Sequence, residues 1–247
     1  LKIQSKSKRK KTIKNFIDCK KNMFFYQLIF FIILSFKYIF GCSIDNEICI
    51  CNKIINTHLH KVNCSERIFN TIQFPLLNNL LKEEFTYDSV KIVFKNYSVI
   101  PNKAFNYFKI NELILYYNQI FKVDDEAFSF IYNLNKLHIG SNYITDLNFI
   151  RFLYNLTELD LGSNKIEIIK NNTFANLNKL RILKLAINRI IDIEQDGFKN
   201  LNKLSILLLF NNKLKSFETK NSNELINLTF LDLKNNLINK VKINNLT

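Results

Sequence analysis

The chain has 247 residues and is 47% hydrophobic, which suits one large folded domain or two small ones rather than extended disorder. Its 4 glycines and 2 prolines are too few for phosphate-cradling glycine loops or for Gly- and Pro-rich linkers. The net charge of +14 does not favour a nucleic-acid partner, because residues 1–41 carry ten Lys or Arg and one acid, which leaves only +5 for the other residues.

The first 41 residues read as a leader. Residues 1–22 hold nine Lys or Arg, and Met23, the only methionine, opens an apolar run that ends at Phe36 and is followed by Lys37 and Gly41. That run has the length of a signal-peptide core and is shorter than the roughly 20 residues that span a bilayer. We expect residues 23–41 to be a signal peptide removed near residue 41, and residues 1–22 to be an upstream segment outside the native protein.

Two other interpretations of the leader stay open. If residues 1–22 are a genuine cytoplasmic arm, their positive charge would hold residues 23–41 as an uncleaved membrane anchor. The sequence Ile39-Phe40-Gly41-Cys42 also has some likeness to a bacterial lipoprotein signal.

Four cysteines follow the leader within 23 residues: Cys42, Cys49, Cys51 and Cys64. An even, clustered set after a secretory signal predicts disulfide bonds, and four cysteines allow three pairings. The alternative is a zinc site, because His58 and His60 lie close to Cys49 and Cys51 in the sequence.

An internal repeat fills the remainder of the chain. Six copies of a Leu-x-Leu/Ile-x-x-Asn pattern place asparagines 24, 22, 24, 24 and 24 residues apart, at Asn118, Asn142, Asn164, Asn188, Asn212 and Asn236. A degenerate earlier copy begins at Val90, so about seven repeats occupy residues 90–247. The chain stops within what reads as a further repeat, so we expect it to be incomplete at the carboxyl end.

Each position of the repeat has a physical role. The two leucines of Leu-x-Leu point to one side of a short strand and enter the core, while the alternating residues face solvent. The asparagine amide can satisfy backbone groups that lie too deep for water, which predicts an asparagine ladder. Bulky apolar residues, 13 or 14 positions before the next asparagine, predict a phenylalanine spine at Phe105, Phe128, Phe174 and Phe198, with Ile150 replacing phenylalanine in the 22-residue repeat.

The six registered repeats and the preceding cysteines resemble the extracellular leucine-rich-repeat family, with typical 24-residue repeats and a cysteine-rich N-terminal cap. The resemblance implies an α/β-type horseshoe solenoid, with short parallel strands on the concave face and an irregular, 3-10 or short helical convex side. It also implies a cap and lead-in over residues 42–89 that covers the apolar end of the solenoid. In that family the first cysteine pairs with the third and the second with the fourth, which here would join Cys42 to Cys51 and Cys49 to Cys64.

Ligands of such solenoids usually bind the concave face, so the outward strand positions are the candidate site. We expect an aromatic patch of Tyr116, Tyr117, His138 and Tyr143, because aromatic side chains with polar tips are favoured binding anchors. A basic stripe should run in register through Lys165, Arg189 and Lys213 and attract an acidic protein surface or a sulfated glycan. Lys184 and Phe210 are further outward-facing candidates.

Acceptor sequences for N-glycosylation are expected to be used at Asn96, Asn155, Asn171, Asn227 and Asn245. The three histidines have no partnered nucleophile and no paired carboxylates share an evident pocket, so we predict neither an enzyme nor a cofactor.

These features favour an extracellular scaffold that binds another protein and is secreted into the medium or matrix. The alternatives are the ectodomain of a single-pass membrane receptor of the Toll-like or adhesion type, and the recognition domain of a receptor kinase. A membrane attachment would then come from residues 23–41 or from a helix beyond residue 247. The sequence does not identify the ligand, because the outward positions carry no general code.

Overall fold

The computed structural model describes residues 50–53, 59–64, 86–93, 97–105, 108–218 and 224–242, and only the backbone of the first two ranges. The chain divides into residues 1–40 and 41–247, and every described residue belongs to the second unit. Our predictions for the basic segment, the signal peptide, Cys42 and Cys49 therefore lie outside the described residues. Within the described ranges, no helix has the length and apolar character needed to cross a membrane.

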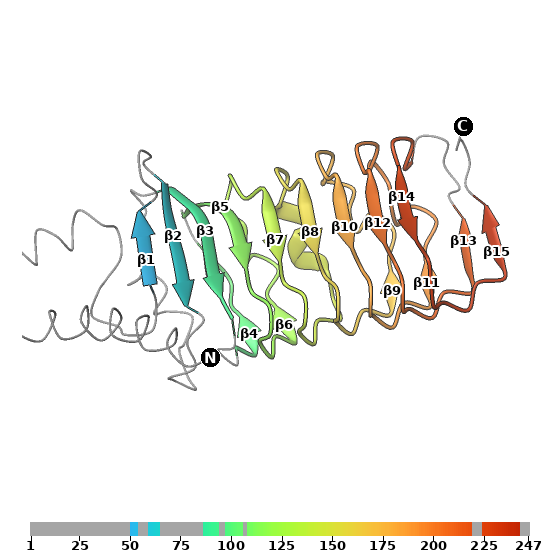
Figure 1. The fold of residues 1–247 in the computed structure, drawn as a ribbon, viewed down its shortest axis with the longest axis horizontal. Helices are drawn as coiled ribbons and strands as arrows, with labels where there is room; N and C mark the ends of the chain where they lie inside the picture. The colour runs from blue at the N-terminus through green and yellow to red at the C-terminus, as the bar shows by residue number, and fades with distance from the viewer. Residues whose placement is uncertain are drawn as a thin grey trace, which may run out of the picture. The chain divides into compact units, whose positions relative to one another are not determined.

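A nine-stranded sheet is the main element, and its strand order follows the chain (Figure 1). The first two strands pair antiparallel, and every later pair is parallel, so each turn of the chain adds one strand beside the last. This arrangement is a solenoid of stacked coils and confirms the predicted fold class. The strands are β1 (Ile50–Lys53), β2 (Leu59–Cys64), β3 (Thr86–Ile92), β5 (Lys109–Ile114), β7 (Lys136–His138), β8 (Glu158–Asp160), β10 (Ile182–Lys184), β12 (Ile206–Leu208) and β14 (Phe230–Asp232).

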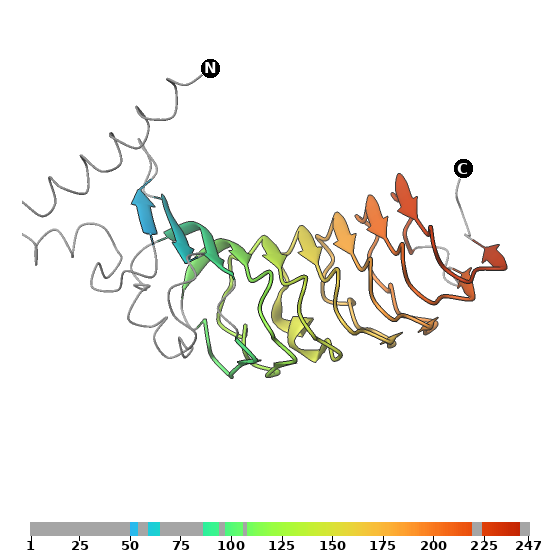
Figure 2. The same cartoon turned by 60° about the horizontal axis from the view of Figure 1, so that its bottom comes forward.

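The return side of most coils carries short extended pairs (Figure 2). These pairs are β4 (Val99–Ile100) with β6 (Lys122–Val123), β9 (Ile168–Ile169) with β11 (Asp192–Ile193), and β13 (Ser216–Glu218) with β15 (Lys240–Lys242). The one 3-10 helix among the described residues, η2 (Asn148–Phe152), lies in the 22-residue repeat. The prediction of an irregular, 3-10 or short helical convex side fits η2 but did not include the extended pairs, because strands of two or three residues are too short to show an alternating pattern.

The core lies between the sheet and the return segments. The leucines of the Leu-x-Leu pattern are buried in every complete coil, from Leu113 to Leu209. Phe105 stacks on Phe128 at 5.3 Å, and Phe174 stacks on Phe198 at 6.2 Å between ring centroids. In the 22-residue repeat Ile150 is buried at the spine position, as predicted, and the neighbouring Phe149 also contributes, with its ring 5.7 Å from that of Phe128.

The six repeat asparagines join each coil to the one before it. The Asn188 side chain is typical: its Nδ2 donates to the carbonyl oxygens of Leu161 and Leu185, each at 3.0 Å, and its Oδ1 accepts from the backbone N–H of Ile166 at 3.1 Å. The same set of bonds recurs at Asn142, Asn164, Asn212 and Asn236. Because one amide supplies both donors and an acceptor, it satisfies backbone groups of two coils that water cannot reach.

The residue before each repeat asparagine has a left-handed backbone conformation. Its φ lies between 53° and 57° at Tyr117, Ser141, Ser163, Ile187, Asn211 and Asn235. This conformation turns the backbone N–H toward the next coil, where that of Ile187 donates to the carbonyl oxygen of Phe210 at 2.9 Å. Left-handed geometry is unfavourable for side chains branched at Cβ, so Ile187 is strained.

Replacing Ile187 with asparagine should therefore raise the free energy of unfolding by about 1 kcal/mol, measured by urea denaturation. The matched control is Ile191→Asn, because Ile191 is 51% exposed against 49% for Ile187 but has no positive φ. An equal gain in the control would show that backbone strain is not the cause.

Candidate functional site

The solvent side of the nine-stranded sheet, the predicted concave face, changes character along the chain. Each strand presents outward residues six, four and two positions before its repeat asparagine. On β7 and β8 the first two are charged or polar and the third, just past the strand, is glycine. On β12 the first two are Ile206 and Leu208, and Phe210 follows the strand. The face therefore has a polar half over β5 to β8, which Lys184 on β10 borders, and a largely apolar half centred on β12, with Asp232 and Lys234 at its far side.

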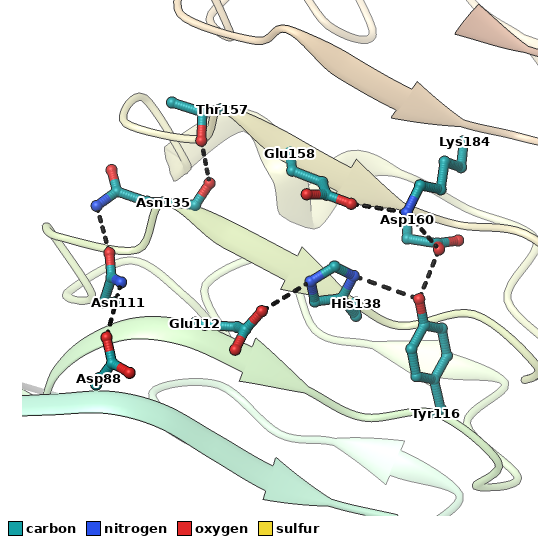
Figure 3. A network of polar contacts seen from close by, with 10 residues as sticks. All are labelled: Asp88, Asn111, Glu112, Tyr116, Asn135, His138, Thr157, Glu158, Asp160 and Lys184. Carbon is teal, nitrogen blue, oxygen red and sulfur yellow. Dashed lines mark hydrogen bonds and ion pairs between the residues drawn. The ribbon is translucent and has the colours of Figure 1, made fainter. Parts of the chain in front are cut away.

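A hydrogen-bonded network of charged side chains covers the polar half (Figure 3). The Tyr116 hydroxyl donates to Asp160 Oδ2 at 2.5 Å and also lies 3.3 Å from His138 Nδ1. Lys184 Nζ donates to Glu158 Oε1 at 2.7 Å and lies 3.5 Å from Asp160 Oδ2. The network thus joins β5, β7, β8 and β10 across the face.

Two glycines make the reach of Tyr116 feasible. A Cβ at Gly140 would lie 2.7 Å from the Tyr116 ring and 2.8 Å from the carbonyl oxygen of Gly162. A Cβ at Gly162 would lie 3.2 Å from Asp160 Oδ1, which accepts from the Gly162 backbone N–H at 2.9 Å. Because β7 has no side chain at residue 140, the tyrosine ring crosses it and reaches the carboxylate on β8.

The electrostatics of the network hold its groups in their paired states. Burial acts to raise the pKa of Glu158, but the hydrogen bond and charge of Lys184, with the charges of His138 and Lys136, bring it below its ordinary value. For Lys184 burial acts to lower the pKa, and the bonds and charges of Glu158 and Asp160 raise it. Burial, together with the bond to Asp160, raises the pKa of Tyr116, so its hydroxyl remains a donor.

The predicted aromatic patch is only partly assembled. The rings of Tyr116 and Tyr117 lie 6.1 Å apart and those of Tyr116 and His138 lie 5.7 Å apart. His138 was expected to face a ligand, but it is only 9% exposed, because it lies between Tyr116 and Glu112, whose Oε1 is 3.2 Å from Nε2. Tyr143 instead lies near Lys165, whose Nζ is 5.7 Å from the Tyr143 ring centroid.

His138 is positioned as a structural link rather than as a binding group. The single Tyr116 hydroxyl proton goes to Asp160, so the Tyr116 oxygen can only accept from His138 Nδ1. The Glu112 carboxylate likewise accepts from Nε2. A neutral ring makes one of these two bonds and a doubly protonated ring makes both.

A second polar row borders the network at the amino ends of the strands. Asn111 Nδ2 donates to Asp88 Oδ1 at 3.4 Å, Asn135 Nδ2 donates to Asn111 Oδ1 at 2.5 Å, and the Thr157 hydroxyl donates to the Asn135 carbonyl oxygen at 3.1 Å (Figure 3). The polar half is therefore largely satisfied by its own contacts.

The apolar half is a separate surface, which we call the apolar panel and define as Ile182, Ile206, Leu208, Phe210 and Phe230. Ile182 and Phe230 lie on either side of Ile206 in the register of β10, β12 and β14. Phe230 is 53% exposed and the other four are half-buried. Sequence analysis singled out only Phe210, and a count of the positions six residues before each asparagine would have found the row.

The predicted basic stripe lies in register at the carboxyl ends of the strands. The backbone N–H groups of Lys165, Arg189 and Lys213 each donate to the preceding coil at 2.9 Å. Lys165 is half-buried near Tyr143, whereas Arg189 and Lys213 are exposed. Lys184, a predicted ligand-face residue, forms ion pairs with Glu158 and Asp160.

Two hollows lie beside the 22-residue repeat, away from the sheet face. Their volumes are about 440 and 710 Å³, and both are lined by Thr145, Asp146 and Arg151. Arg151 Nη2 lies 3.6 Å from Asp125 Oδ2 in the larger one. Within the described ranges, no group of three or more His, Cys, Asp or Glu residues could hold a metal ion.

The structure describes only some residues of the predicted cap and some of the predicted glycosylation sites. Cys51 lies in β1 and Cys64 in β2, but their side chains are not described, so the disulfide pairing and the alternative zinc site stay predictions. Asn96 and Asn245 lie outside the described residues. Asn171 and Asn227 are exposed and Asn155 is half-buried, where its Nδ2 donates to the Tyr132 carbonyl oxygen.

Lys184→Met should lower the free energy of unfolding at about pH 7 by about 1 kcal/mol, since the lysine is partly exposed and its ion pairs are screened. Because folding lowers the pKa of Glu158, ionised Glu158 stabilises the fold at pH values above 4.5, its ordinary pKa. This stabilisation is lost as the pH falls through the folded-state pKa. The difference between the wild-type and variant chains should therefore shrink at about pH 3 in urea denaturation. Lys203→Met, which removes an exposed lysine, is the control. A difference that is the same at both pH values would contradict the prediction.

Comparison with known proteins agrees with this geometry. Residues 148–190 and 179–238 match the Leucine rich repeat family. The chain is 22% identical to the APL1 leucine-rich repeat domain, with a TM-score of 0.55 over 70% of this chain and 42% of that one. It is 29% identical to an internalin (inlF) of Listeria monocytogenes, over 68% of this chain and 52% of that one, with a TM-score of 0.46.

The chain thus spans about half or less of the length of these two structures. No curated protein matches the sequence. Residues 148–238 thus match the leucine-rich-repeat family, and the solenoid of parallel coils that contains them has the leucine-rich-repeat fold.

Proposed function

We propose that this chain is an extracellular, non-enzymatic scaffold that binds another protein through the concave face of its solenoid. Leucine-rich-repeat solenoids are commonly protein-binding scaffolds, and such families are typically non-enzymatic. The observation that carries the proposal is β12 with the residues just after it, whose outward side chains are Ile206, Leu208 and Phe210. A strand that presents only large apolar side chains to solvent favours burial against a partner.

The polar half supports the choice of the apolar panel as the binding surface. Its acids and bases pair with one another, so a partner bound there would have to replace bonds that already exist. A partner on the panel replaces only water, and removal of apolar area from water is favourable. We therefore place the binding centre on β12.

Capture by the full chain tests the binding proposal. The wild-type chain, incubated with secreted and cell-surface proteins, should retain a partner that Leu208→Asp retains at least about tenfold less, because a buried carboxylate opposes docking. Tyr132→Asp is the matched control, since Tyr132 is 63% exposed and lies outside the sheet. If every captured protein is indifferent to Leu208→Asp, the concave-face proposal fails.

The extracellular part of the proposal rests on the predicted signal segment of residues 23–41 and the four clustered cysteines. The surroundings of the acceptor asparagines provide a sharper test. Asn171 Oδ1 accepts from the Asp196 backbone N–H at 2.8 Å, and among the described residues its Nδ2 has no partner. The Nδ2 of Asn155 and of Asn227 donates to a backbone carbonyl.

Expression in a secreting animal cell line should place the chain in the medium with an N-glycan at Asn171. Asn171→Gln should then remove one glycan from the mass of the secreted protein, whereas Asn155→Gln, the control, should change it less. Both variants keep an amide, so folding is preserved in the comparison. Retention of an unglycosylated chain inside the cell would contradict the extracellular proposal.

A further inference from the structure

We propose that the partner of the apolar panel is a protein segment that combines apolar side chains with carboxylates. The inference rests on the proposed binding at β12 and adds the chemistry of the occupant. It follows from the cations that border the panel without an ion pair. The acids nearest to the panel are Asp232 on β14 and, on β8, Glu158 and Asp160, which already pair with Lys184.

Three exposed cations border the panel at the carboxyl end of its strands, one for each strand. We call Arg189, Lys213 and Lys234 the cationic rim. They follow β10, β12 and β14 in turn, and Arg189 and Lys213 occupy equivalent positions in successive coils. No ion pair within the described residues involves any of the three.

The segment that contains β12 carries only positively charged side chains. Residues 197–217 contain four lysines, Lys199, Lys203, Lys213 and Lys215, and no Asp or Glu. Lys199 pairs with Asp196 of the same coil at 3.7 Å. The acid beside the panel, Asp232, turns Oδ1 toward the backbone N–H of Lys234 at 3.0 Å. Within the described residues the three rim cations thus have no ion-pair partner, and an incoming carboxylate would pair with them favourably.

The cationic rim alone would suit either a sulfated glycan or an acidic protein segment, and the apolar panel distinguishes between them. A sulfated glycan has negative charge but no apolar side chains for Ile206, Leu208 and Phe210, so it would leave them in water. An acidic amphipathic protein segment buries the panel and pairs with the rim at once. The side-chain chemistry therefore favours a protein.

Selection from a displayed library of random peptides tests this inference, with the wild-type full chain as target and Leu208→Asp as the chain for counter-selection. Peptides that require the panel should be rich in Leu, Ile or Phe and in Asp or Glu. If Leu208→Asp does not fold, Phe230→Asp, at a more exposed position, serves the same purpose. Enrichment of basic or uncharged apolar peptides would overturn the acidic partner but leave concave-face binding intact. Absence of any panel-dependent peptide would overturn the proposed function as well.

The affinity of an enriched acidic peptide then tests the rim. Arg189→Glu, Lys213→Glu and Lys234→Glu together should weaken binding by at least about tenfold, and added salt should weaken binding to the wild-type chain. The melting temperature should stay within about 2–4 °C, as expected for exposed changes. The control reverses three exposed lysines elsewhere, Lys109→Glu, Lys170→Glu and Lys203→Glu, and should leave the affinity within about twofold. Equal effects of both triple variants would show that the rim does not contact the peptide.

Heparin provides a second test. If heparin binds the wild-type and Leu208→Asp chains equally and displaces the peptide, the ligand of the rim is a sulfated glycan and the proposed acidic protein segment is wrong.

Discussion

The asparagine bonds between coils are the constraint on which the remainder of this structure depends. Each amide donates to two carbonyl oxygens and accepts from one N–H, and the groups it joins belong to adjacent coils. The bonds fix the spacing and register of the strands, because a slipped coil would leave buried polar groups without partners. The left-handed residue before each asparagine, including the strained Ile187, persists for the same reason.

The 22-residue repeat shows where the fold tolerates change. Asn164 still accepts from the Ile144 backbone N–H at 3.0 Å, although the two residues lie 20 apart in the sequence rather than 22. The loss of two residues is absorbed on the return side, where η2 and Phe149 replace the extended segment and phenylalanine of the regular coils. The ladder thus protects the sheet face, and variation in length is directed away from it.

The regular sheet face places side chains from distant parts of the chain beside one another. The chemistry of these side chains divides the face into a polar half and an apolar panel. Over β5 to β8 the charges satisfy one another, with the Tyr116–Asp160 bond spanning 44 residues of sequence. Around β12 the apolar panel and the three rim cations have no such ion pairs among the described residues, so they are left for a partner. The same repeat therefore yields a self-contained surface in one half and a binding surface in the other.

The sequence by itself determined the fold class, the six asparagines and the leucines of the core, because a period of 22–24 residues admits only one way to bury the same positions in every coil. It also placed the outward residues on one face. It could not show that His138 is buried or that Lys184 forms ion pairs, since the contacts of both residues come from Glu112, Glu158 and Asp160 in neighbouring coils. Two of the four glycines, Gly140 and Gly162, share one repeat position, yet only the tertiary structure showed what lies beside them: the Tyr116 ring at Gly140 and the Asp160 carboxylate at Gly162.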